Sequence, residues 1–126
     1  GININSGFLS GSNIVTSPND LITLIKNNFS TATVSLNNPK KIGTGTKLTI
    51  TNNGSKTYNL LIYGDNNGDG TIDILDLLKV QKHLLKSAKL IDVYLKSSDT
   101  NKDGTVDILD LLTIQKHILG TGNISQ

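Results

Sequence analysis

The chain of 126 residues contains no cysteine, methionine, tryptophan, arginine or glutamate. Without cysteine it can form no disulfide and no thiolate zinc site, and it has no cysteine nucleophile. No apolar run approaches the roughly 20 residues that cross a bilayer, so no membrane partner is expected. With two phenylalanines, three tyrosines and no tryptophan, it also has few of the aromatic rings on which sugars stack.

Charge of each sign comes from a single residue type. All twelve cations are lysine and all ten anions are aspartate, giving a net charge of +2. The lysines are scattered, which argues against a nucleic-acid partner. Eight of the ten aspartates lie within residues 65–76 and 99–110. Carboxylates gathered this closely repel each other unless they are solvated or tied to a cation.

The two aspartate-rich segments belong to an internal duplication. Residues 65–85 and 99–119 are identical at 15 of 21 positions, with an offset of 34. The composition changes at Gly64, which predicts two modules, residues 1–64 and 65–126, with repeats at 65–86 and 99–120. Hydrophobic residues make up only 36% of the chain. Because small modules bury a small share of their surface, an added stabiliser is expected.

The first half is predicted to be a small α+β module. Ser17-Pro18-Asn19-Asp20 is typical of a helix start, and apolar spacing predicts a helix over about residues 18–29. A strand is predicted at 31–36. The segment 47–64 reads as a hairpin that turns at Asn53-Gly54. A further strand is expected at 2–5 or at 13–16.

The second half is predicted to be all-α. The sequences DILDLLKVQKHLLKS, from Asp73, and DILDLLTIQKHIL, from Asp107, each begin with an aspartate that can cap a helix. Each then spaces leucine and isoleucine as in a helix with one buried face. A short helix is predicted between them at about residues 90–96, and Gly120 is expected to end the last helix.

Both duplicated segments have the spacing D-x-N-x-D-G-T-[IV]-D-x-x-D. Oxygen ligands at positions 1, 3, 5 and 12 of a twelve-residue loop, with glycine at position 6, are the arrangement of an EF-hand calcium loop. Position 7 is expected to offer a backbone carbonyl and position 9 to ligate through water. The predicted ligands are Asp65, Asn67, Asp69, Thr71, Asp73 and Asp76 in the first loop. In the second loop they are Asp99, Asn101, Asp103, Thr105, Asp107 and Asp110.

These ligands indicate two Ca²⁺ ions with a structural role. The donor set lacks sulfur and imidazole, which disfavours zinc and copper. Asparagine, glycine and aspartate also form plain turns before capped helices, but two complete copies favour calcium over that alternative. The chain has no methionine-rich groove, and a strand precedes the first loop instead of a helix, so a calcium sensor is not expected. Calcium would then be the added stabiliser.

Two such loop–helix repeats, each followed by LL-x-[VI]-Q-K-H-[LI]-L and joined by a short helical linker, resemble a dockerin module. The resemblance covers about residues 65–120. It implies a non-catalytic, extracellular adaptor that binds cohesin domains of scaffold or cell-surface proteins, as in cellulosomes that degrade polysaccharides. Residues 1–64 resemble the small X-type modules that precede some dockerins, on the stretch TGTKLTI…TYNLLIYGD.

The resemblance also implies a partner-binding surface on both repeats. Loop positions 10 and 11 and helix positions near 17 and 18 contact the cohesin in dockerins. Here these residues are Ile74, Leu75, Gln81, Lys82, Ile108, Leu109, Gln115 and Lys116. An Ile-Leu pair at a helix start can equally belong to a core, and that alternative stays open. Because both copies carry the same residues, the surface is expected to be two-fold symmetric, with either helix able to dock.

An enzyme and a purely structural or carbohydrate-binding module are the alternatives to the adaptor. An enzyme would need a base, a nucleophile or an open metal in a pocket. The histidines, His83 and His117, occupy equivalent repeat positions, where a structural role is expected, so the chain is not predicted to be an enzyme. The alternative to the adaptor is a calcium-stabilised extracellular structural or carbohydrate-binding module. The unbound protein is expected to be a monomer.

Overall fold

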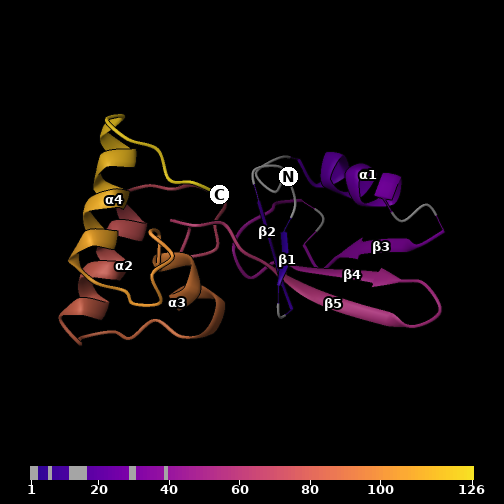
Figure 1. Cartoon of the computed structure of the whole chain (residues 1–126), viewed down its shortest axis with the longest axis horizontal. Helices are drawn as coiled ribbons and strands as arrows, with labels where there is room; N and C mark the ends of the chain where they lie inside the picture. The colour runs from indigo at the N-terminus through magenta and orange to yellow at the C-terminus, as the bar shows by residue number, and fades with distance from the viewer. Residues whose placement is uncertain (1–2, 6, 12–16, 29–30, 39) are drawn as a thin grey trace.

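The computed structural model shows a β-sheet with one helix at one end of the molecule and three helices at the other (Figure 1). It describes residues 3–5, 7–11, 17–28, 31–38 and 40–126. None of the helices in these segments is long and apolar enough to cross a membrane. The chain thus has the α+β first half and the helical second half that the sequence predicts.

The sheet has five strands in the order β1-β2-β5-β4-β3. The strands are β1 (Asn3–Asn5), β2 (Phe8–Ser10), β3 (Thr33–Leu36), β4 (Lys47–Thr51) and β5 (Ser55–Leu60). The predicted hairpin is β4–β5, and Leu48 lies opposite Tyr58. Its turn uses Asn53 and Gly54, both with positive φ, at 54° and 132°, the backbone that asparagine and glycine adopt at least cost.

Strand β2 was missed in the sequence. The predicted strand at 2–5 corresponds to β1, while the alternative at 13–16 lies outside the described residues. β2 has only three residues, with a single buried side chain, Leu9, so it shows no alternation that a pattern could detect. It forms an antiparallel hairpin with β1 and joins the rest of the sheet by pairing in parallel with β5, a contact between distant parts of the chain.

Helix α1 (Pro18–Asn28) packs against the sheet and closes the first core. The predicted start is confirmed, since Asp20 N donates to Ser17 Oγ at 3.2 Å. Leu21 and Ile25 are buried, and Phe29, which the prediction included in the helix, lies outside the described residues. The first core consists of Leu9, Leu21, Ile25, Val34, Ile42, Leu48, Leu60 and Ile62.

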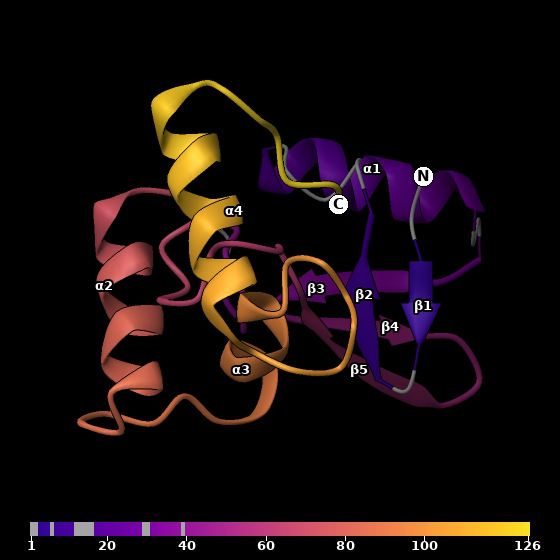
Figure 2. The same ribbon diagram turned by 60° about the vertical axis from the view of Figure 1, so that its left-hand side comes forward.

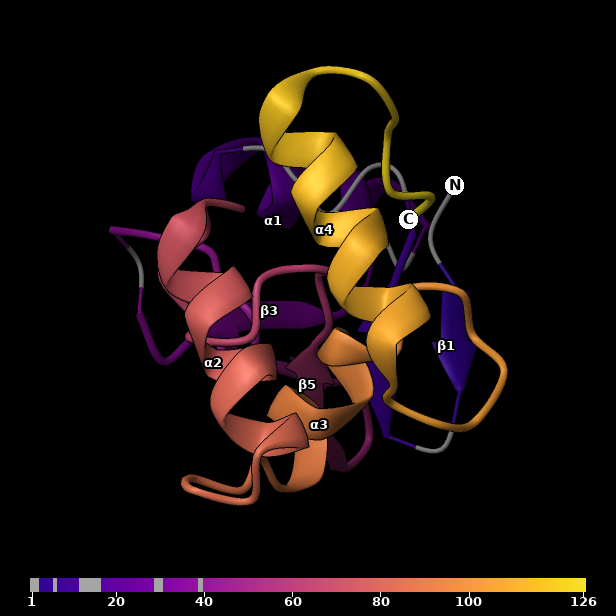
Figure 3. The same cartoon turned by 90° about the vertical axis from the view of Figure 1, so that its left-hand side faces the viewer.

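Three helices form the second half: α2 (Ile74–Leu84), α3 (Asp92–Ser98) and α4 (Ile108–Leu119). Helices α2 and α4 lie side by side and run in opposite directions, with α3 across one end (Figures 2 and 3). The fully buried Val80 of α2 and Ile114 of α4 occupy equivalent repeat positions. The second core is therefore built around a two-fold pseudo-symmetry.

The two histidines have equivalent structural roles. Nδ1 of His83 accepts from Leu90 N at 3.0 Å, and Nδ1 of His117 accepts from Ile124 N at 3.3 Å. Leu90 and Ile124 are both buried in the second core. Each histidine thus fixes the segment that follows its helix, and the duplication extends further than the repeats predicted from identity.

Helix α3 begins two residues later than the sequence predicts. The predicted range was about 90–96, whereas α3 spans Asp92–Ser98. The N–H of Leu90 is taken by His83, so this residue is held in the core ahead of the helix. Ile91, with extended backbone, is the N-cap residue.

The change from the first core to the second falls close to the predicted module boundary. Ile62 belongs to the first core, while Tyr63 packs against the second. Gly64 N donates to Ser97 O at 2.8 Å, which ties this point of the chain to α3.

Candidate metal loops and docking face

Each duplicated segment folds into a loop that gathers three carboxylates. Within each group, one oxygen from every aspartate lies within 4.8 Å of the others. The groups are Asp65, Asp69 and Asp76 in the first loop, and Asp99, Asp103 and Asp110 in the second. These residues occupy positions 1, 5 and 12 of the predicted calcium loops.

The glycine at position 6 lets each loop turn sharply. Gly70 and Gly104 have φ of 83° and 89°, in the region that side chains disfavour. The turn brings Gly70 N to Asp65 Oδ2 at 3.0 Å and Gly104 N to Asp99 Oδ2 at 2.9 Å. The first aspartate is thereby oriented by its own loop in both copies.

The last carboxylate joins each loop to its helix. Asp76 Oδ1 accepts from Asn66 N and Asn67 N at 3.1 and 3.2 Å, while Oδ2 accepts from Asp73 N at 2.9 Å. Asp110 Oδ1 accepts from Thr100 Oγ1 and Asn101 N at 3.3 and 3.2 Å, and its Oδ2 accepts from Asp107 N at 2.9 Å. Because these contacts are half of a capping box, a shift of the loop also disturbs the helix start.

The carboxylates that close the loops are buried and surrounded by like charge. Burial, with the nearby Asp65 and Asp69, raises the pKa of Asp76 to about 7. Burial likewise raises the pKa of Asp65 and of Asp110. The raised pKa values of these three aspartates reflect burial and crowded negative charge, and a group of carboxylate oxygens of this kind suits a hard cation such as calcium.

The other predicted ligands make hydrogen bonds within the loops or at the helix starts. Asn67 Oδ1 accepts from Asp69 N at 3.2 Å, which places the asparagine within the loop. Asp73 and Asp107, predicted to ligate through water, each accept at Oδ1 from the N–H of the second helical residue at 3.0 Å. Neither belongs to a carboxylate group.

The two threonines and the second asparagine support the loops in the same way. Asn101 Oδ1 accepts from Asp103 N at 3.3 Å. Thr71 N and Thr105 N each donate to the position-5 aspartate at 2.9 Å. Their carbonyls stay predicted ligands, and these particular hydrogen bonds are the same in both loops.

The Ile-Leu pairs at the helix starts are exposed in both repeats. Ile74 and Leu75 are 54% and 52% exposed, and Ile108 and Leu109 are 56% and 54% exposed. The alternative that places either pair in the core is therefore excluded. The exposed polar partners at the equivalent helix positions are Gln81, Lys82, Gln115 and Lys116.

Further leucines extend these exposed apolar surfaces beyond the residues identified in the sequence. They are Leu78, Leu85, Leu112 and Leu119. The sequence does contain a signal for them. In both repeats, at the offset of 34, these leucines lie off the helix face that carries Val80 and Ile114. A groove of about 300 Å³ runs along α2 and includes Leu75, Leu78 and Lys82. We call these exposed residues of α2 and α4, together with the Ile-Leu pairs, the docking face.

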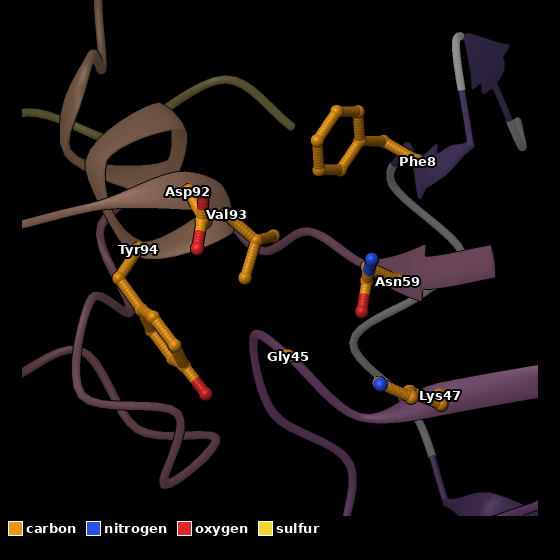
Figure 4. Close-up of a pocket in the computed structure, with 7 residues that line it drawn as sticks. All are labelled: Phe8, Gly45, Lys47, Asn59, Asp92, Val93 and Tyr94. Carbon is orange, nitrogen blue, oxygen red and sulfur yellow. The ribbon is translucent and has the colours of Figure 1, made fainter.

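A second hollow, of about 390 Å³, lies between the sheet and α3 (Figure 4). It is lined by Phe8, Gly45, Lys47, Asn59, Asp92, Val93 and Tyr94. These seven residues include no nucleophile paired with a base, so the hollow does not have the composition of an active site.

Within the described part of the chain, the aromatic side chains do not line up as an exposed surface on which sugars could stack. Lys96 Nζ lies 5.3 Å from the ring centroid of Phe8, and Lys102 Nζ lies 4.6 Å from that of Tyr63. Tyr58 packs against the first core. This arrangement favours the docking face over a sugar-stacking platform.

Comparisons with known proteins place the second half in a family. The model of the dockerin type I domain matches residues 63–124. No curated protein matches the chain. A solved complex of the third cohesin of ScaC with a mutated ScaB dockerin from Acetivibrio cellulolyticus, described as a type I interaction, contains a similar chain. That similarity has 21% identity and a TM-score of 0.49 over 52% of this chain and 92% of the other. On the match to the family model alone, residues 63–124 are a dockerin type I domain.

Proposed function

We propose that the protein is a non-catalytic, calcium-dependent adaptor that docks its parent protein onto a cohesin domain. The observation that carries the proposal is the pair of equivalent, half-exposed Ile-Leu surfaces at the starts of α2 and α4. They lie in the segment that matches the dockerin family. Apolar surface that is exposed in the free protein and repeated by an internal symmetry is typical of a binding site.

The two loops are proposed to be EF-hand-type sites for two Ca²⁺ ions. In each, the carboxylates at positions 1, 5 and 12, the asparagine at position 3 and the carbonyl at position 7 would hold the ion. Position 9 would contribute chiefly as the helix cap. Calcium supplies the charge that offsets the repulsion among the aspartates. In this role it is structural, because the same carboxylates fix the helix starts that present the docking face.

The remaining features of the chain fit a modular extracellular protein. We assign residues 1–64 as an X-type module and residues 65–126 as the dockerin module. An extracellular place, where calcium is abundant, and a parent protein concerned with polysaccharide degradation both follow from the family. Catalysis, in this proposal, belongs to other parts of such assemblies.

Cohesin binding is tested by calorimetric titration of the full chain against a panel of cohesins in calcium. Tight binding to one class of cohesin is expected. One cohesin should bind per chain, because the two repeats are proposed as alternative modes of docking and not as two separate sites. Calcium uptake without binding to any cohesin would contradict the adaptor function. It would leave a calcium-stabilised structural or carbohydrate-binding module.

Calcium affinity is expected to fall as the pH is lowered through about 7. Burial raises the pKa of Asp76 to about 7, so below that pH calcium must displace a proton from its ligand. One released proton corresponds to about a tenfold loss of apparent affinity for each further pH unit. For the metal-free protein, a raised folded-state pKa means that stability from this group is lost as the pH rises through about 7.

Calorimetry between pH 5.5 and 8, in two buffers of different ionisation enthalpy, measures both the affinity and the protons released. The comparison variant is Asp76→Asn, which removes the titrating group together with one charged ligand; it should weaken the first site at every pH and reduce the dependence of its affinity on pH. An affinity that stays constant across this range in the unaltered protein would contradict the assignment of Asp76 as a ligand.

A further inference from the structure

A loop of the first half lies directly on the first metal loop. Residues 42–46, with the sequence IGTGT, form this covering loop. A Cβ atom added to Gly43 would lie 2.1 Å from the carbonyl oxygen of Gly68. One added to Gly70 would lie 2.3 Å from Ile42 O. The two backbones are therefore in contact with no room for side chains between them.

The covering loop is held on its other side by α3. A Cβ atom on Gly45 would lie 2.5 Å from the hydroxyl oxygen of Tyr94, whose side chain points towards this glycine (Figure 4). The hydroxyl of Thr44 accepts from Ile62 N and donates to Ile62 O, both at 3.0 Å. The position of the loop is thus fixed by α3 of the dockerin module and by the segment after β5 that leads into that module.

Thr44 contacts a predicted metal ligand directly. Its N–H donates to Asp65 Oδ2 at 2.9 Å, the same oxygen that accepts from Gly70 N. Asp65 is fully buried. A hydrogen bond accepted by a ligating carboxylate orients that carboxylate and restricts its motion before the ion binds.

The second loop has no equivalent cover within the described part of the chain. Asp99, which corresponds to Asp65, is only partly buried, and its carboxylate accepts from Asp103 N and Gly104 N of its own loop. A Cβ atom added to Gly104 would meet no atom within 4 Å. The duplicated sequence thus folds into two loops with different surroundings.

We infer that residues 42–46 are a positioning element for the first calcium site, and that this site binds calcium more tightly and releases it more slowly than the second. The inference rests on the proposed calcium binding. Because coupling is reciprocal, calcium in the first loop also stabilises the packing of the first half against the dockerin module. The cause is the Thr44–Asp65 hydrogen bond, with exclusion of water by the covering loop.

Nuclear magnetic resonance of the full chain can follow the two loops separately. The amides of Gly70 and Gly104 donate to the first ligand of each loop, so each resonance reports one site. As free calcium is raised, Gly70 is expected to reach its midpoint at about a tenfold lower concentration than Gly104, the usual size of an outer-shell effect. The Gly43→Ala variant should raise the Gly70 midpoint by about tenfold and leave the Gly104 midpoint within about twofold.

The matched control is Gly122→Ala, where the added Cβ would lie at an ordinary 3.4 Å from Lys116 Cβ. It should change neither midpoint. Equal midpoints in the unaltered protein, or equal shifts of both in Gly43→Ala, would overturn the inference. If Gly43→Ala disrupts the sheet, the order of the midpoints in the unaltered protein still decides. Failure of both glycines to respond would instead overturn the proposed calcium binding.

Discussion

Removal of calcium with a chelator is expected to abolish cohesin binding and to melt most of the helix. Without the ion, each loop holds three carboxylates within 4.8 Å, and the carboxylate that closes the loop also caps the helix. At an effective dielectric constant of about 20, two unit charges this far apart repel by roughly 3 kcal/mol. Each bound ion, at a hundredfold excess over its Kd, stabilises the folded state by about 2.7 kcal/mol.

Circular dichroism and calorimetry measure this result. Helices α2, α3 and α4 contain 11, 7 and 12 residues, against 11 in α1. Loss of these three helices would therefore remove up to about three quarters of the helical signal. The sheet and α1 have a core of their own and should persist. Return of signal and binding on adding excess calcium is the control. A spectrum that chelation leaves unchanged would contradict a structural role for the ion.

Replacement of both Ile-Leu pairs by alanine is expected to weaken cohesin binding by about 30- to 700-fold, whereas replacement of either pair alone should lower affinity by only about twofold. If either helix can dock, loss of one pair removes one of two equal modes. Loss of both pairs removes the apolar contact from each mode. At roughly 1–2 kcal/mol for each half-exposed side chain that becomes buried, this weakens binding by about 30- to 700-fold.

The variants to compare are Ile74→Ala with Leu75→Ala, Ile108→Ala with Leu109→Ala, and all four together. Since these side chains are about half exposed and alanine favours helix, folding should be unaffected. Ile91→Ala, at an exposed apolar residue outside α2 and α4, is the matched control. Complete loss of binding on changing Ile74 and Leu75 alone would contradict the two-fold symmetric model of docking.

The loops and helix starts could be predicted because their determinants are local. The spacing of aspartate and glycine within twelve residues places the carboxylates of each loop, and the same aspartates cap α2 and α4. The β4–β5 hairpin was predicted for the same reason, from its Asn53-Gly54 turn. In each case the interacting groups lie within a few residues of one another, so the pattern contains the geometry.

Other features depend on contacts between residues far apart in the chain. The exposure of Ile74 and Leu75 follows from how α2 packs against α4, and periodicity at a helix start is compatible with either outcome. Strand β2 pairs locally with β1, but it joins the rest of the sheet through its parallel pairing with the distant β5.

The difference between the two metal loops has the same origin. Their sequences are nearly identical, yet Thr44, 21 residues before Asp65, reaches only the first loop. The sequence by itself determined which carboxylates gather in each loop and where the repeated helices begin, because hydrogen bonds within a turn depend on local spacing. Only the tertiary structure decided which surfaces are free to bind and which loop is covered, because burial depends on the whole packing arrangement.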